Sequence, residues 1–272
     1  MDNNQNDMYE DEESLTRIVE DDVFPMKFFD RVFGIFFSPG KVMENIKQYP
    51  KIGAAVIVVL IISAISAIYA MDIAEIALEE TTIIYVERYG ADYFNFSEVL
   101  QTGAGGAGMD LIVNITTIAT LLVTPFVMAF IATLVLFIFS KIFRGWARFG
   151  QLYTMLFHIY MVTYLLNLIP TAFIVINQSS LNILSLAMFF MPDGNITMPM
   201  FNLLSAITIP AIWEAVLIFI GIKILNEWKN GKALAVTALN LGIWVGGAVL
   251  IQHLSLMVMD WSFNLMTGTT FF

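Results

Sequence analysis

The stretch IGAAVIVVLIISAISAIYAM, Ile52–Met71, carries no charged side chain and is long enough to cross a lipid bilayer as a helix. About 20 apolar helical residues span the hydrocarbon core of about 30 Å. Four further stretches are also long and predominantly apolar, roughly Leu111–Ile142, Leu152–Ile176, Leu203–Leu225 and Ala233–Met259. The sequence therefore predicts an all-α integral membrane protein built as a five-helix transmembrane bundle.

The composition of the chain supports this membrane class. Charged residues make up 13% of the 272 residues and hydrophobic residues 58%, with a mean hydropathy of +0.76. A globular domain usually carries about 25% charged residues. The chain has no cysteine, which excludes disulfides and thiolate chemistry. Acidic residues crowd the N-terminus, so we expect residues 1–25 to form a disordered cytosolic tail.

Lysine and arginine gather on one side of the predicted spans. They lie before the first span, between the second and third, and between the fourth and fifth, and only Arg88 falls on the other side. The positive-inside rule therefore predicts a cytoplasmic N-terminus. The membrane domain covers residues 51–262, with an outer loop at residues 72–110. Five spans then leave residues 263–272 as an extracytoplasmic tail.

Residues 26–50 precede the first span and predict two amphipathic helices on the cytoplasmic face. In FPMKFFDRVFGIFF the charged Lys27, Asp30 and Arg31 interrupt one side of the first helix. The other side carries an apolar stripe of Phe29, Val32, Phe33 and Phe36. This pattern is typical of a helix that lies in the membrane interface with its aromatic rings among the acyl chains.

The second amphipathic helix is predicted in FSPGKVMENIKQYP. Ser38 suits the N-cap and Pro39 the first helical position, while Pro50 ends the helix. The apolar residues on its inward side are Val42, Met43 and Ile46. Two interpretations follow for this pair of helices: a simple membrane anchor, or a docking surface for a cytosolic or membrane partner.

This entry into five spans resembles the Yip1-domain membrane proteins, and the resemblance covers about residues 26–262. A second stretch, KIFRGWARFGQLYTMLFHIYMVTYLLNLIP, adds to it, because a turn with Gly145 and Phe149 leads into a span that ends towards Pro170. The chain lacks the Asp-Leu-x-Gly-Pro motif and the Gly-Tyr pair of eukaryotic members, so it resembles the prokaryotic type. The resemblance implies a non-enzymatic protein that associates with other proteins or with lipid, and we expect a bacterial plasma membrane.

Three polar residues lie within the predicted spans and are candidate functional residues: Glu214, Asn167 and His158. An ionised carboxylate inside a membrane is costly, so Glu214 needs an explanation. Asn167 falls at a similar depth and can share a hydrogen bond with Glu214. Two roles remain open, a protonated carboxyl that joins helices or a site for a proton or substrate.

The remaining motifs predict structure rather than cofactor chemistry. His158 and His253 fall at different depths, so they cannot share a metal ion. The run GAGGAG lies before a membrane span without the strand and lysine of a phosphate-binding loop, so we expect a hinge. Gly242 and Gly246 have the spacing of close helix contacts, either within the bundle or in a homo-oligomer.

Two functions follow from these features. The first is a non-catalytic scaffold or accessory subunit that binds other membrane proteins, such as an ABC-type export complex in toxin or envelope-stress tolerance. The alternative is a small proton-coupled transporter or channel, based on Glu214, Asn167 and the prolines within the spans, Pro125, Pro170 and Pro210. We expect no enzymatic activity, no cofactor, no metal and no nucleic-acid partner.

Overall fold

The computed structural model describes residues 25–89, 107–177, 182–190 and 198–267. The acidic tail up to residue 24 lies outside these ranges. So do most of the GAGGAG run, residues 90–106 of the predicted outer loop and the final residues 268–272. All statements below concern the described residues.

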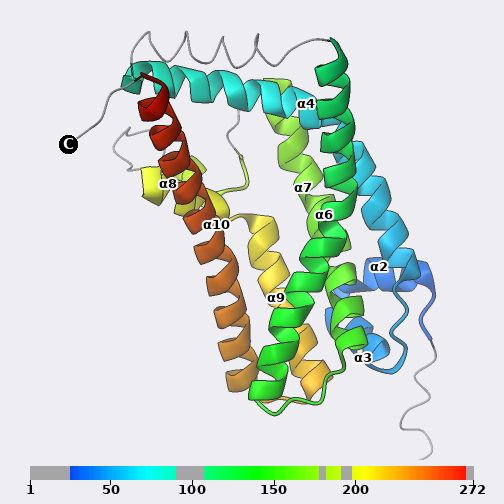
Figure 1. The fold of residues 1–272 in the computed structure, drawn as a ribbon. Coiled ribbons are helices and arrows are strands. Elements are labelled where there is room, and N and C mark those ends of the chain that lie inside the picture. The colour runs from blue at the N-terminus through cyan, green and yellow to red at the C-terminus, as the bar shows by residue number, and fades with distance from the viewer. Residues whose placement is uncertain (1–24, 90–106, 178–181, 191–197, 268–272) are drawn as a thin grey trace, which may run out of the picture.

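Five helices are long and apolar enough to cross a membrane (Figure 1). They are α4 (Gly53–Tyr89), α6 (Ala107–Ile142), α7 (Phe149–Asn177), α9 (Ile209–Asn226) and α10 (Asn230–Thr267). Extended pairing in the described ranges is limited to one bridge between Ser185 and Thr208. The chain is therefore a multi-pass membrane protein of the predicted all-α class.

Two helices extend beyond the apolar stretches that predicted them. The apolar part of α4 is Gly53–Ala70, but the helix continues to Tyr89 and takes in residues expected in the outer loop. This extension, DIAEIALEETTIIYVERY, contains no glycine or proline, and alanine, leucine and glutamate favour helix. Likewise α10 continues to Thr267, past the predicted start of the C-terminal tail.

The predicted fourth span, 203–225, is divided in two. Helix α8 (Met198–Ala206) ends first, and α9 then begins at Ile209. The hydroxyl of Thr208 accepts a hydrogen bond from Ala211 N at 3.1 Å and caps α9. Pro210 thus occupies the first turn, where its missing N–H is not needed, and it starts a helix instead of kinking one.

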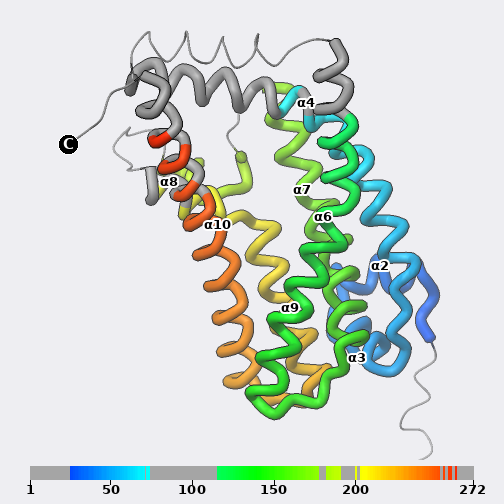
Figure 2. Tube along the Cα trace, in the orientation of Figure 1, coloured from blue at the N-terminus to red at the C-terminus, as the bar shows by residue number. Residues whose placement is uncertain are grey.

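Helix α7 lies at the centre of the bundle, in contact with α4, α6 and α9 (Figures 1 and 2). Its N-terminal half is buried on every side, from Leu152 to Thr163 apart from the half-buried Tyr153. Two short helices complete this enclosure, α2 (Phe28–Phe37) and α3 (Pro39–Gln48), which both contact α7. The core is therefore concentrated in the half of the bundle that these helices cover.

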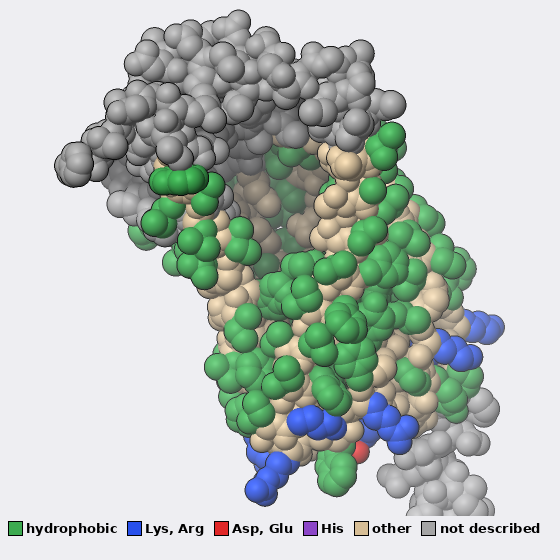
Figure 3. Space-filling view, viewed as in Figure 1, with side chains coloured by type: hydrophobic (Ala, Val, Ile, Leu, Met, Phe, Trp, Pro, Cys, Tyr) green, Lys and Arg blue, Asp and Glu red, His purple; other side chains and the backbone are tan. Residues whose placement is uncertain are grey.

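That half ends in a surface rich in lysine and arginine, which we call the basic end (Figure 3). It is formed by the C-termini of α6 and α9 and the N-termini of α7 and α10. Its basic residues include Lys141, Arg148, Lys223 and Lys232. Towards the other end of the molecule, α6 and α10 diverge (Figure 1).

Candidate functional site

Helices α2 and α3 form a platform on the side of the bundle near the basic end (Figure 1). Arg31 of α2 holds the platform together, and only 4% of its surface is exposed. Its Nη2 and Nε atoms donate to Oδ1 of the fully buried Asn45, at 2.5 and 3.0 Å. The guanidinium therefore joins α2 to the middle of α3.

The same guanidinium reaches the end of α3. Nη2 donates to the carbonyl of Tyr49 at 2.9 Å and Nη1 to that of Lys51 at 3.2 Å. A cation is favoured here because carbonyls at a helix C-terminus lack intrahelical partners. Burial lowers the pKa of Arg31 below its usual value. The sequence analysis placed Arg31 on the charged outer side of α2, and this prediction is wrong. The guanidinium group has five N–H donors, so it can be buried where several acceptors surround it.

The platform is also fixed by apolar packing. Val42, Met43 and Ile46 are completely buried and belong to the core of the bundle. The anchor interpretation assigned these three residues to the membrane interface, but they attach α3 to the protein instead. Gly221 of α9 makes this packing possible, because a Cβ atom there would collide with the sulfur of Met155 and lie 3.3 Å from that of Met43.

The predicted phenylalanine stripe of α2 is split between two environments. Phe29 and Phe33 are 68% and 61% exposed, and Phe37 joins them at 84%. Val32 and Phe36 pack against the core instead. The exposed phenylalanines follow a spacing of four residues and form one outer face of the platform, which we call the Phe face.

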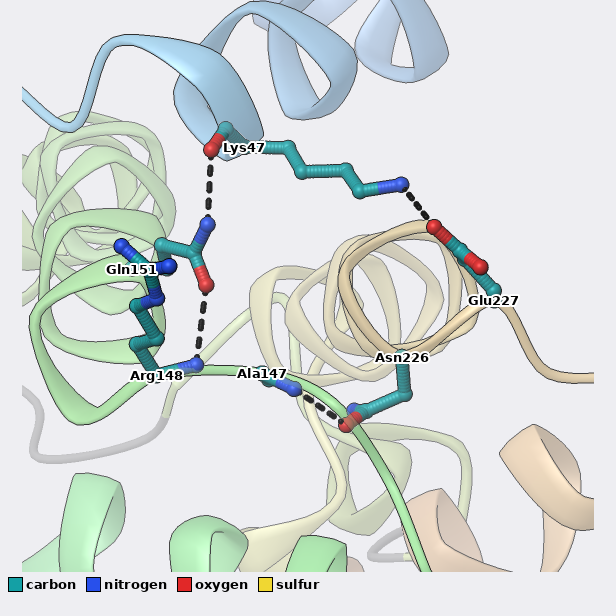
Figure 4. A network of polar contacts seen from close by, with 6 residues as sticks. All are labelled: Lys47, Ala147, Arg148, Gln151, Asn226 and Glu227. Atoms are coloured by element: carbon teal, nitrogen blue, oxygen red, sulfur yellow. Dashed lines mark hydrogen bonds and ion pairs between the residues drawn. The ribbon is translucent and has the colours of Figure 1, made fainter.

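A second polar network connects the platform to the loops of the basic end (Figure 4). Lys47 of α3 forms an ion pair with Glu227, with 2.5 Å between Nζ and Oε1. The Lys47 carbonyl accepts a hydrogen bond from Gln151 Nε2 at 2.6 Å, and Gln151 Oε1 accepts one from Arg148 N at 2.8 Å. Glu227 stands at the end of α9 with a left-handed φ of 56°. The platform is thus tied to α7 and α9.

Asn226, the last residue of α9, is buried, and its side chain makes three hydrogen bonds. Its Oδ1 accepts from the Ser140 hydroxyl at 2.5 Å and from Ala147 N at 3.0 Å. Its Nδ2 donates to the Ile222 carbonyl at 3.1 Å. Gly145 of the predicted turn is needed here, because a Cβ atom would collide with Asn226 Oδ1. Sequence reasoning missed Asn226, although an asparagine beside a helix end is a common signal for a cap.

Glu214 lies on a cavity within the bundle and not against Asn167. The cavity holds about 350 Å³ between α6, α7, α9 and α10. Other polar side chains on it include Tyr160, Tyr164 and Asn240. Asn167 is not among its lining residues, and no hydrogen bond between Asn167 and Glu214 is present in the described part of the chain. The predicted partner of Glu214 is therefore wrong.

His158 is separate from this cavity. Its ring is buried in the core, and Nδ1 lies 2.8 Å from the carbonyl of Thr154, one turn earlier in α7. Among the described residues, no group of three His, Asp or Glu side chains is placed to hold a metal ion. Of the three polar candidates, only Glu214 lines the cavity.

Gly242 and Gly246 do not pack within the bundle. Both lie on the exposed side of α10, and a Cβ atom built at either position meets no atom within 4 Å. The interpretation of these glycines as contacts inside the bundle is wrong. The close crossing is made by Gly221, whose sequence context, IFIGIKIL, has no second small residue at the expected spacing.

The fold and the platform define a class: a five-span helical membrane protein with two amphipathic helices docked beside one end of its bundle. The profile of the Yip1 domain matches this chain over residues 33–260. This range includes α3, four of the spanning helices and α10 up to residue 260, so the protein belongs to the Yip1 domain family. Neither the curated proteins nor the solved structures yield a match.

Proposed function

We propose that this protein is a non-catalytic membrane scaffold or accessory subunit whose α2–α3 platform binds another membrane protein. The basic end faces the cytoplasm in this proposal, in keeping with the positive-inside rule. The observation that carries it is the Phe face, which presents Phe29, Phe33 and Phe37 to the surroundings from a platform fixed to the bundle.

The rigidity of the platform supports this role. Helices of ten residues are marginal on their own in water. Here the buried Arg31 and the ion pair of Lys47 hold them against the bundle. A prearranged surface loses less conformational entropy when it binds. Such fixation exceeds what a simple lipid anchor requires, because an anchor needs only an apolar face.

The position of the Phe face limits the kind of partner. Helix α2, which carries the face, lies beside the bundle near the basic end (Figure 1), and we place this end at the cytoplasmic membrane interface. Aromatic residues there contact lipid or the interfacial part of another membrane protein. We propose the bacterial plasma membrane as the location. The partner we propose is a multi-subunit membrane assembly, such as an ABC-type export complex in toxin or envelope-stress tolerance.

Affinity capture in mild detergent with mass spectrometry tests this function. Phe29→Ser combined with Phe33→Ser should abolish recovery of the partner while leaving the protein in the membrane, because five spans remain to hold it. Trp146→Ser is the matched control, since Trp146 is 77% exposed in the loop before α7 but lies outside the Phe face. Equal recovery with the double variant and the control would refute the proposal.

A proton-coupled transporter or channel is the second candidate, and the position of Glu214 on a cavity favours it. This role is tested by proton-coupled flux into liposomes that contain the purified protein alone. Flux that Glu214→Gln abolishes would replace the scaffold proposal. If neither the wild type nor Glu214→Gln raises the proton flux above that of empty liposomes, the scaffold remains the better explanation.

A further inference from the structure

We propose that the cavity around Glu214 binds an amphiphile with a protonated amine head and an apolar body, which enters from the bilayer between α6 and α10. This inference goes beyond the scaffolding function and does not depend on it. It rests on the shape of the cavity, on its polar side chains and on one buried acceptor without a partner.

The cavity is open to the apolar surroundings of the bundle. Thr124 and Met128 of α6 form one wall, and Leu241, Trp244 and Val245 of α10 form the facing wall. The two helices diverge away from the basic end (Figure 1), and a hollow is visible between them (Figure 3). A ligand dissolved in the bilayer can therefore reach the cavity without crossing water. A volume of about 350 Å³ suits a small molecule.

The polar groups of the cavity comprise one carboxyl and several neutral side chains. Glu214 supplies a carboxyl about 18 Å from the C-terminal end of α9, counting twelve residues at about 1.5 Å each. Tyr160 and Tyr164, one turn apart on α7, face the same space.

Asn240 shows that the cavity is incomplete in the protein alone. Only 3% of its surface is exposed, and its Oδ1 has no hydrogen-bond partner. A buried acceptor without a donor is costly, and native proteins rarely leave one unexplained. Glu214 and Asn240 both line the cavity.

The charge of the residues that line the cavity determines which ligand head group can bind there. Among the described residues that line the cavity there is no lysine or arginine, and Glu214 is the single carboxyl. A phosphate or a fatty-acid head would therefore meet like charge without compensation. An ammonium group instead offsets the desolvation of the carboxylate. The rings of Tyr160, Tyr164 and Trp244 add cation–π attraction.

Native mass spectrometry of the full chain in detergent tests this proposal with four probes of known chemistry. Octylamine has the proposed head, octanoate reverses the charge, and octanol has no charge. Lysophosphatidylethanolamine carries the amine on a phosphate and so distinguishes a free amine from a phospholipid. We expect one octylamine per chain, with an affinity at least about tenfold above those of the other three. Equal binding of octanoate or of the lysolipid would overturn the proposal.

Variants identify the site. Glu214→Gln should weaken octylamine binding about tenfold, the effect of one charge-assisted hydrogen bond. Asn240→Leu should weaken it severalfold. Asn167→Leu is the matched control, because Asn167 is an intramembrane asparagine outside the cavity, and it should change nothing. Thermal unfolding of each variant verifies its folding, and if Glu214→Gln does not fold, Asn240→Leu and Tyr164→Phe decide. Octylamine affinity unchanged in the variants that fold would refute the site.

Discussion

The basic end and the cavity lie in one bundle, yet they treat polar side chains in opposite ways. At the basic end, Asn226 is buried and makes three hydrogen bonds that join α6, the following loop and α9. In the cavity, Asn240 is equally buried and its Oδ1 has no partner. The same residue type thus stabilises structure in one region and marks a candidate binding site in the other.

The reason for the difference is the arrangement of the helices. Near the basic end, α2 and α3 close the space around α7, and short loops bring helix ends together, so Asn45, Asn226 and Arg31 all find partners there, although the indole nitrogen of Trp228 does not. Between α6 and α10 the helices separate, and the polar groups of α9 and α10 face a gap. Dense packing is therefore concentrated near the basic end, and the cavity lies where the helices separate.

Among the variants that test this comparison, Arg31→Leu should change the free energy of unfolding most. The change removes all four hydrogen bonds of the buried guanidinium, although Asn45 Oδ1 keeps its bond from Met26 N and the Tyr49 carbonyl keeps its bond from Lys51 N, and we expect a loss of about 3 kcal/mol in the free energy of unfolding. Reversible unfolding in mixed detergent micelles measures this loss. Arg31→Leu with Asn45→Leu should recover part of it, since both partners are then apolar. A loss below about 0.5 kcal/mol would show that the platform does not depend on Arg31.

Asn226→Leu should produce the next largest effect. It removes the acceptor of Ser140 and Ala147, so we expect destabilisation of about 2 kcal/mol. The same unfolding measurement applies. Stability equal to the wild type would mean that water replaces these hydrogen bonds.

Asn240→Leu should have the opposite sign. It removes an unpaired buried acceptor and replaces it with apolar surface, so we expect a gain of about 1 kcal/mol in the absence of ligand. The comparison between Asn226→Leu and Asn240→Leu is therefore a direct measure of the difference between the two regions. Destabilisation by both variants would show that Asn240 has a partner in the protein.

The smallest effect is expected from Glu227→Gln, which breaks the ion pair with Lys47. The two side chains are 63% and 35% exposed, and ion pairs of this kind contribute less than about 1 kcal/mol. A titration of stability against salt concentration measures this contribution. Salt should weaken the wild type slightly and leave Glu227→Gln unchanged, whereas equal salt responses would rule out a contribution from the pair.

Local sequence signals predicted much of the platform correctly. The boundary at Ser38 and Pro39 between two amphipathic helices is present, because the fixed φ of proline acts locally, although the Ser38 side chain makes no capping hydrogen bond. The burial of Val42, Met43 and Ile46 follows from their helical spacing. The role of Arg31 could not be predicted, because its acceptors lie in the next helix and beyond it.

The intramembrane site shows the same limit. Glu214 was identified because a carboxylate in an apolar stretch is unusual by itself. Its predicted partner was chosen by depth alone, and depth does not specify which faces of two helices meet. Asn240 and the tyrosines of α7 face Glu214 only because of the rotation and divergence of the helices.

The sequence by itself determined the membrane class, the number of spans and the family. Each of these depends on local composition or spacing. For the spans, the physical reason is that the free energy of transferring a segment from water into the bilayer depends on the composition of that segment. The tertiary structure decided which polar side chains are satisfied and which face a cavity. Those outcomes depend on contacts between residues far apart in the chain, such as Lys47 with Glu227. They also depend on where such a contact is missing, as at Asn240 Oδ1.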